Sequence, residues 1–561
     1  MPSGDGQLRS RIDGGEEVLQ ELKGRISIRN IRQSLLLILS SFAFMALNLQ
    51  RDPQKLIALP AALLFIVLFF SQAAGIREKL RKVRTGIKAY AAASAAGTCL
   101  YAAQSFISRT GNALESRQTI LVLTVLSVAA ALLSLVAVYT LTALLLDHVV
   151  HVLTPLLREL TGTEIAVCIM IAAALAGYSI FAFWKSTAFW DSGMSYEVIY
   201  TSDSPSMIEP NVFLWLYHPE NDIRQPLFAV FSAPLIAPAY ILALPFAGLS
   251  RMAVPLLMNL FQIALLVLTN LMLTGMLRLG KRSRICFMLI TSVLYTTLLF
   301  SIMIEQYIIA YFWLIFAAYS YTAEGKTSVI AVSAAGGTLL TSLAFMPLAY
   351  RAETDGKGFR SFLEKMVKAA AGFLTLFLAC GRLDTLMGFS KKADVLASFT
   401  GGRSITERAN QYLSFVSSCF AAPDAAADTF TYGHPSWQMT GQNVLNTDYI
   451  GLILLLLCAV SVILNRREKA VRIAGAWAAF SVLLLLVIGW GAPENGMILY
   501  TLYFGWAFLV LLFRLAEWLA AKMNFGLLTP LLTCTIVALL GLHNFRGIGE
   551  LLAFAVSNYP A

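Results

Sequence analysis

Residues 185–226, KSTAFWDSGMSYEVIYTSDSPSMIEPNVFLWLYHPENDIRQP, separate one apolar run of the chain from the next. The stretch follows the run at 165–184 and leads into the run at 225–250. Apolar runs of about 20 residues are long enough to cross a bilayer as helices. This arrangement predicts a polar loop at a membrane surface, joined to a membrane segment on each side.

The rest of the chain has the composition of a membrane protein. Of its 561 residues, 58% are hydrophobic and 13% are charged, which excludes an ordinary soluble globule. Further charge-free runs lie at 33–50, 56–76, 89–108, 118–146, 252–277, 285–304, 306–323, 327–350, 449–465, 473–493, 495–513 and 523–545. A shorter run at 369–381 has Lys and Arg on both sides, whose side chains can reach the two interfaces. We therefore predict an all-α, polytopic membrane protein with about 13–15 membrane segments.

The net charge of +10 comes from short basic segments between apolar runs, which argues against a nucleic-acid partner. Loops rich in Lys and Arg face the cytoplasm. These segments are Arg9 to Arg32, Arg77 to Lys88, Arg278 to Arg284, Arg351 to Lys368 and Arg466 to Arg472. They predict a protein of the plasma membrane with a cytoplasmic N-terminus and an extracytoplasmic loop at 185–224.

Two runs conflict with this topology if each is counted as one straight span. Residues 225–250 contain four prolines, and residues 327–350 contain Gly336, Gly337 and Pro347. We predict that the first is re-entrant or bent and that the second divides into two short half-helices. All acid-bearing loops then face the outer compartment.

The pattern of runs and loops divides the chain into five parts. We predict a cytoplasmic tail at 1–32, an N-terminal four-helix membrane block at 33–163, a membrane core at 164–385 with its outer loop at 185–225, an extracytoplasmic loop at 386–448, and C-terminal membrane helices at 449–561.

Acidic residues gather in the outer loop, where only Lys185 and Arg224 oppose them. The six carboxylates are Asp191, Glu197, Asp203, Glu209, Glu220 and Asp222. Three more polar segments are predicted on the same face: 305–307, 433–438 and 490–500. Acids gathered at a membrane surface indicate catalysis or cation binding rather than packing. The sequence therefore predicts one site, formed by these four segments, at the outer membrane boundary.

The loop resembles the first outer loop of the GT-C superfamily, the polytopic glycosyltransferases that include protein O-mannosyltransferases and the aminoarabinose transferases of lipid A. The likeness rests on a long acid-bearing loop that closes on His218 and enters the next helix at Gln225-Pro226-Leu227. It covers 165–385, the usual core of that superfamily. The sequence departs from the family pattern at the second proline and at the Asp-Glu pair, because Asp191 is followed by Ser192.

The resemblance implies transfer of a sugar from a polyprenyl-phosphate-linked donor to an acceptor on the extracytoplasmic face, with inversion. It also implies that an aspartate of the loop is the catalytic base, which would be Asp203 or Asp191 here. We add Glu305 as a third catalytic candidate. The candidate substrate-binding residues are His218, Arg224, Gln306, His434 and Glu494. Asp222 and Asp203 could hold Mg²⁺ or Mn²⁺ through their oxygen atoms.

Each candidate also has a structural explanation. Asp203 fits a turn or a helix cap, and Asp191 fits an interfacial acid beside Trp184 and Trp190. Asp222 and Arg224 can form a salt bridge. Glu305 and Glu494 can lie in solvated turns, and His434, Trp437 and Gln438 can pack a loop.

Two other functions stay open. One is a transporter or flippase for a lipid-linked glycan or small solute, although such proteins carry polar groups near the bilayer midplane. The other is a polymerase or ligase for lipid-linked glycans. Arg403 and Arg408, in the predicted loop 386–448, suit the second of these.

Overall fold

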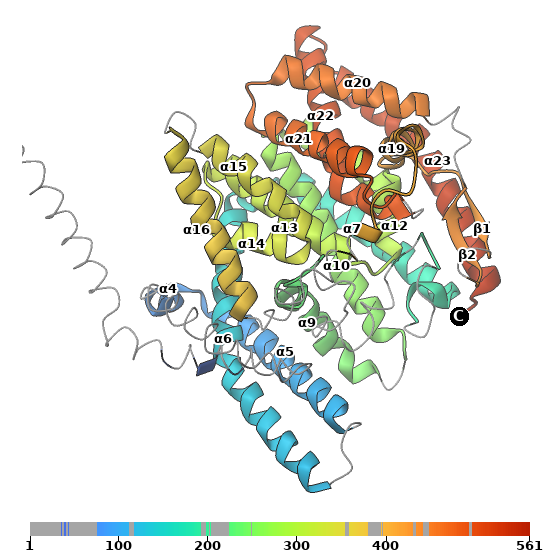
Figure 1. Cartoon of the computed structure of the whole chain (residues 1–561). Coiled ribbons are helices and arrows are strands. Elements are labelled where there is room, and N and C mark those ends of the chain that lie inside the picture. Colours follow the sequence, from blue (N-terminus) through green and yellow to red (C-terminus); the bar gives the residue numbers. More distant parts are fainter. Residues whose placement is uncertain are drawn as a thin grey trace, which may run out of the picture. The chain divides into compact units, whose positions relative to one another are not determined.

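The computed structural model describes residues 35, 39, 40, 43, 76–111, 117–191, 198–200, 202, 224–247, 250–353, 358–379, 394, 397–429, 433–440, 448–492 and 496–561. Across these residues the chain is helical apart from turns and one antiparallel pair of strands. The predicted all-α class is confirmed at this level. Figure 1 shows the described elements in chain order.

The helices range from about two turns to more than ten turns. They are α4 (Ile76–Lys82), α5 (Thr85–Gly111), α6 (Arg117–Arg158), α7 (Gly162–Lys185), α9 (Phe228–Ala247), α10 (Ala253–Met276), α11 (Lys281–Val293), α12 (Tyr295–Ile302), α13 (Gln306–Glu324), α14 (Val329–Thr338), α15 (Phe345–Glu353), α16 (Gly358–Ala379), α19 (Ile405–Ser418), α20 (Asp448–Asn465), α21 (Lys469–Ser481), α22 (Thr501–Lys522) and α23 (Leu528–Asn558). The short elements are η2 (Thr187–Phe189), η4 (Leu340–Ala344), η5 (Val482–Ile488), η6 (Gly496–Tyr500), β1 (Ala425–Asp428) and β2 (Ser436–Met439).

The described chain contains helices suited to a membrane. Six helical segments are long and apolar enough to span one, and the bent pair α11 and α12 would make a seventh. The described residues therefore form a multi-helix membrane-type fold. Two of the predicted 13–15 segments, at 33–50 and 56–76, lie mostly or wholly outside the described residues, and the runs at 327–350 and 449–465 contain the shorter apolar helices Val329–Thr338 and Tyr449–Asn465.

The chain divides into two compact units. The first comprises Met1–His151 and Ala371–Gly388, and the second comprises Val152–Ala370 and Phe389–Ala561. In the first unit, α5 and the part of α6 up to His151 are rich in Ala and Leu, which favours helix formation and close packing. The candidate residues that the structure describes, Asp191, Arg224, Glu305, Gln306 and His434, belong to the second unit.

Helix α13 lies at the centre of the second unit. Its sequence QYIIAYFWLIFAAYSYTAE is apolar or aromatic on every side, and every residue from Gln306 to Thr322 is buried. A helix that is hydrophobic all round must be covered on all faces. Helices α10, α14 and α22 pack against α13, as Figure 1 shows. It is therefore the core element from which the site is positioned.

The prolines and glycines shape the neighbouring elements. The run 327–350 divides into α14, η4 and α15, which confirms the predicted half-helices. Helices α11 and α12 are bent by 60° at Leu294. Residues 228–247 form one helix, α9, and its internal Pro234, Pro238 and Pro245 fall on one face at helical spacing.

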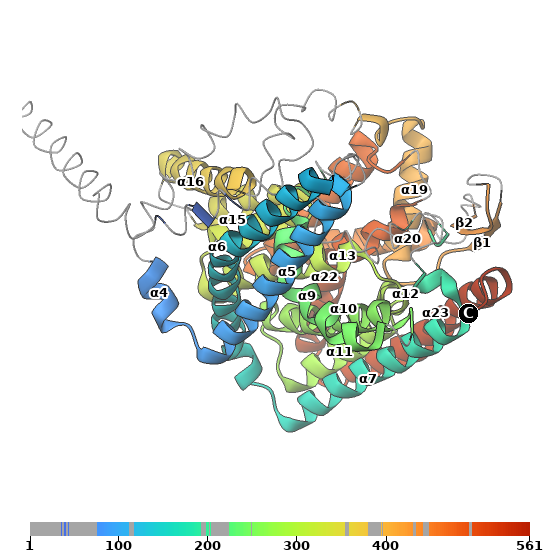
Figure 2. The same ribbon diagram turned by 90° about the horizontal axis from the view of Figure 1, so that it is seen from below.

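The predicted loop 386–448 contains regular structure in its described part. Helix α19 begins at a capping box in which Ser404 and Glu407 bond each other's backbone N–H groups. Strands β1 and β2 then form an antiparallel hairpin. The C-terminal ends of α7 and α23 meet (Figure 2), where the Ser186 hydroxyl donates to Tyr559 O at 2.6 Å.

Candidate functional site

A break between α12 and α13 places a carboxylate inside the second unit. Glu305 is the N-cap of α13, and its side chain accepts a hydrogen bond of 2.6 Å from Gln306 N. The residue is 0% exposed. The alternative of a solvated turn at Glu305 is therefore wrong. A buried carboxylate is costly unless hydrogen bonds, charge or a proton compensate it, and the positive end of α13 supplies part of that compensation.

One glutamine of α10 satisfies the backbone at this break. Gln262 Nε2 donates to Glu305 O at 3.0 Å, and Gln262 Oε1 accepts from Glu305 N at 3.3 Å. Because the helical ladder is interrupted here, the Glu305 N–H would otherwise lack a partner, whereas the Glu305 C=O, as the N-cap carbonyl, also accepts the first hydrogen bond of α13. Gln262 thereby fixes the position from which the Glu305 side chain projects.

Asn259 lies one turn earlier on α10 and joins two further helices. Its Nδ2 donates to Ser179 Oγ of α7 at 2.7 Å and to Ser301 O of α12 at 2.6 Å. Both Asn259 and Gln262 are buried. The sequence reasoning did not select either residue. The available signal was amide side chains inside the apolar run 252–277, where polar groups are expensive.

A row of aromatic rings leads away from this break. The Tyr307 and Tyr500 rings meet edge to face with centroids 5.5 Å apart. Trp490 Nε1 donates to Tyr500 Oη at 2.9 Å, and the Trp490 ring lies 5.8 Å from that of Phe399. The Arg224 guanidinium lies over Phe399, 4.8 Å from the ring centroid. We call these five residues the aromatic row.

Main-chain hydrogen bonds hold the segments that carry the aromatic row. Leu340 N donates to Arg224 O at 2.7 Å, and Gly491 N donates to Phe399 O at 2.8 Å. Gly491 has φ +73°, a left-handed conformation that glycine adopts without strain. The first bond joins the segment before α9 to the α14–η4 junction. The second bond joins residues 397–400 to the 489–491 turn.

The polar segment 433–438 contributes Trp437 to a different cluster, which we call the tyrosine cluster. Tyr200 Oη is 2.7 Å from Tyr295 Oη and accepts from Trp437 Nε1 at 3.0 Å. Tyr200 N also donates to Trp437 O at 2.9 Å. Burial raises the pKa of Tyr200 to about 12, which keeps its hydroxyl protonated. Tyr295 begins α12, and its eight residues, about 12 Å long, separate this tyrosine cluster from Glu305.

The predicted site residues have different outcomes. The aromatic row joins Arg224 and the 490–500 segment to Tyr307, which follows Glu305 and Gln306 in the chain. Asp191 is paired instead with Arg251, whose Nη2 lies 3.1 Å from Asp191 Oδ1. His434 is half-buried, and its Nδ1 is 3.3 Å from Pro435 O. Asp203, His218, Asp222 and Glu494 lie outside the described residues.

The predicted metal site depends on residues outside the described part. Asp203 and Asp222 were its proposed ligands, and both belong to the segment that is not described. Within the described ranges, no group of three or more His, Cys, Asp or Glu side chains could hold a metal ion. The aromatic row itself offers a guanidinium and ring faces, a donor set that suits an anionic or sugar-like ligand rather than a metal.

No family model matches the chain, and neither the curated proteins nor the solved structures include one with significant similarity to it.

Proposed function

We propose that this protein is a membrane glycosyltransferase that uses a polyprenyl-phosphate-linked sugar. The observation that carries the proposal is the aromatic row, which connects the guanidinium of Arg224 with the α12–α13 break that holds Glu305. A phosphate-linked sugar has an anionic group and a ring with apolar faces. A guanidinium and aromatic rings recognise these two features.

The reaction requires a base, an anion partner and a sugar-binding surface. The acceptor oxygen bonds to the anomeric carbon while the bond from that carbon to the donor phosphate oxygen breaks. The acceptor hydroxyl proton passes to a carboxylate, and the electron pair leaves with the phosphate. In the proposed arrangement Arg224 faces the departing phosphate, Trp490 and Tyr500 flank the sugar, and Glu305 or an acid of the loop 185–225 takes the proton.

Release of polyprenyl phosphate tests this proposal without knowledge of the acceptor. The purified protein in nanodiscs is given polyprenyl-phosphate-linked sugars with membrane lipids and peptides as acceptors. Glu305→Gln keeps the size of the side chain and should lower the release rate roughly 100- to 10,000-fold if Glu305 is the base. If Asp203 is the base, Asp203→Asn should show that loss instead.

Arg224→Gln should weaken use of the donor, and Arg546→Gln is its matched control. Arg546 is an exposed arginine of α23 that pairs with Glu550. Its replacement should leave the release rate unchanged. Wild-type protein that releases no polyprenyl phosphate from any donor, or an Arg224→Gln variant that matches Arg546→Gln, would contradict the proposal.

A transporter for lipid-linked glycans or small solutes is the second candidate, and one observation favours it. Asn259, Gln262 and Glu305 form a buried polar group beside the bent pair α11 and α12. Discontinuous helices with buried polar groups are typical of transporter binding sites. Uptake or flipping in proteoliposomes without sugar transfer would favour this candidate, and transfer without uptake would exclude it.

A further inference from the structure

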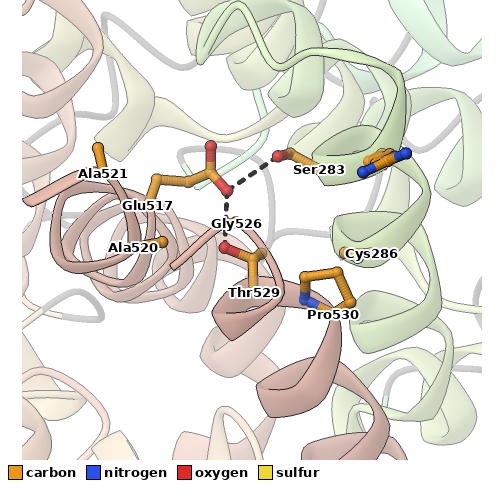
Figure 3. Close-up of a pocket in the computed structure, with 9 residues that line it drawn as sticks. Ser283, Cys286, Glu517, Ala520, Ala521, Gly526, Thr529 and Pro530 are labelled. Carbon is orange, nitrogen blue, oxygen red and sulfur yellow. Dashed lines mark hydrogen bonds between the residues drawn. The ribbon is translucent and has the colours of Figure 1, made fainter. Parts of the chain in front are cut away.

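A small cavity lies at the N-terminal ends of α11 and α23 and at the C-terminal end of α22. The aromatic row and the tyrosine cluster lie towards the opposite ends of these helices. It has a volume of about 260 Å³ and is lined by both charged and hydroxyl side chains (Figure 3). The residues that carry the argument are Arg282, Ser283, Glu517 and Thr529. The neighbouring Lys281 and Lys522 mark this end as the predicted cytoplasmic one.

The carboxylate of Glu517 is held in place by two hydroxyl groups. Ser283 Oγ donates to Glu517 Oε1 at 2.8 Å, and Thr529 Oγ1 donates to the same oxygen at 3.1 Å. Figure 3 shows both bonds converging on one oxygen while the second oxygen points away from them. A fixed carboxylate with an oxygen directed elsewhere can accept hydrogen bonds from an ammonium group.

The opposite charge lies in the same cavity. Arg282 lines it, and a guanidinium binds phosphate through two parallel hydrogen bonds. Arg282 and Thr529 also belong to the first turns of α11 and α23, and neither helix has a side-chain cap bond at its N-cap. The positive ends of these two helices add to the attraction for a phosphate.

The surroundings of the cavity are apolar and exposed. Met523, Phe525, Leu527 and Leu531 follow α22 or begin α23, and each is an exposed large hydrophobic side chain. In a membrane protein such side chains face lipid tails. A ligand that carries acyl chains could therefore place them against these residues while its polar end enters the cavity.

We propose that this cavity binds the headgroup of a phospholipid that bears a primary ammonium group. Its phosphate lies at Arg282, its ammonium group lies at Glu517, and its acyl chains lie along Leu527 and Leu531. The cavity volume suits a headgroup and is smaller than a typical drug-sized ligand site. The proposal does not depend on the proposed enzymatic function.

Native mass spectrometry of the detergent-purified protein tests the site with defined lipids. Phosphatidylethanolamine should be retained in preference to phosphatidylcholine, whose quaternary ammonium has no N–H donor, and to phosphatidylglycerol, which has no amine. Glu517→Gln preserves an acceptor for Ser283 and Thr529 and removes the charge. It should lower phosphatidylethanolamine retention about tenfold and abolish the preference.

Arg282→Gln should weaken retention of all three lipids, and Lys522→Gln is the matched control. Lys522 is an exposed cation near the same helix ends that does not line the cavity. Equal retention of the three lipids by the wild type, or an unchanged preference in Glu517→Gln, would overturn the proposal. If Glu517→Gln does not fold, Arg282→Gln compared with Lys522→Gln carries the test.

A soluble headgroup separates the lipid from a free metabolite of the same chemistry. Glycerophosphoethanolamine lacks the acyl chains, so it should raise the thermal stability of the protein much less than the lipid does. Equal stabilisation by the soluble compound would overturn the assignment to a lipid.

Discussion

Gln262 and Glu305 are 43 residues apart, yet the side chain of the first bonds both backbone groups of the second. This pairing ties α10 to the start of α13, which is buried from Gln306 to Thr322. It also determines where the Glu305 carboxylate lies. The relationship therefore links the stability of the core to the geometry of the candidate site.

Gln262→Leu should destabilise the protein and disturb the site. The substitution replaces the amide with an apolar side chain of similar size and leaves the Glu305 N–H without a partner, at about 1–3 kcal/mol for an unsatisfied buried donor, while the Glu305 C=O keeps its bond within α13. Unfolding in a denaturing detergent measures the loss. Ala264→Ser, at an exposed position of the same helix, should change the free energy of unfolding by less than about 0.5 kcal/mol.

Asn544→Ala should loosen the bend between α11 and α12. Asn544 Nδ2 donates to Val293 O at 2.7 Å and to Phe420 O at 2.8 Å, and its Oδ1 accepts from Ala422 N at 2.7 Å. Removal of all three bonds from a buried position should cost about 2–4 kcal/mol. Asn558→Ala, at an exposed position of the same helix, is the control, and an equal loss in the two variants would contradict the assigned role.

Gly491→Ala should damage the aromatic row. Gly491 has φ +73°, and an added Cβ would lie 2.9 Å from Tyr500 Cε2. The substitution combines backbone strain with a steric clash, so we expect destabilisation by about 1–3 kcal/mol and loss of donor use. Gly177→Ala in α7 meets no atom within 4 Å and should be neutral or stabilising, by up to about 1 kcal/mol. The melting temperatures of the two variants should therefore move in opposite directions.

Alkaline pH should destabilise the protein through Tyr200. Burial raises its pKa to about 12, from an ordinary value of 10.0. Below pH 10 the hydroxyl is neutral in both the folded and the unfolded state. Between pH 10 and 12 the unfolded state ionises first, so the stability that Tyr200 contributes should fall with rising pH, by at most about 3 kcal/mol.

Tyr200→Phe provides the comparison for this effect. The variant loses the hydrogen bonds with Tyr295 and Trp437 at every pH but has no hydroxyl to ionise at this position. The free energy of unfolding, measured from pH 8 to 11.5, should decline less steeply in the variant. Parallel curves for the wild type and the variant would show that Tyr200 does not titrate in this range.

Much of the fold was predictable because the bilayer restricts the choices. Spanning segments must satisfy their own backbone groups, so apolar runs predict helices, and these are present throughout the described residues. The glycines and Pro347 in 327–350 also predicted the division into α14 and α15. Helix α19 and the β1–β2 hairpin were missed, because a polar composition between apolar runs resembles a loop.

The sequence by itself determined the class of the protein, a multi-helix membrane-type chain, and it drew attention to Arg224, Glu305 and the 490–500 segment. It could not show that Glu305 is buried or that Gln262 bonds both of its backbone groups, because the composition of an apolar run does not specify which helices pack against each other. Only the tertiary structure placed α10 against α13 and separated the tyrosine cluster from the aromatic row. The physical reason is that burial and hydrogen-bond partners depend on contacts between residues far apart in the chain.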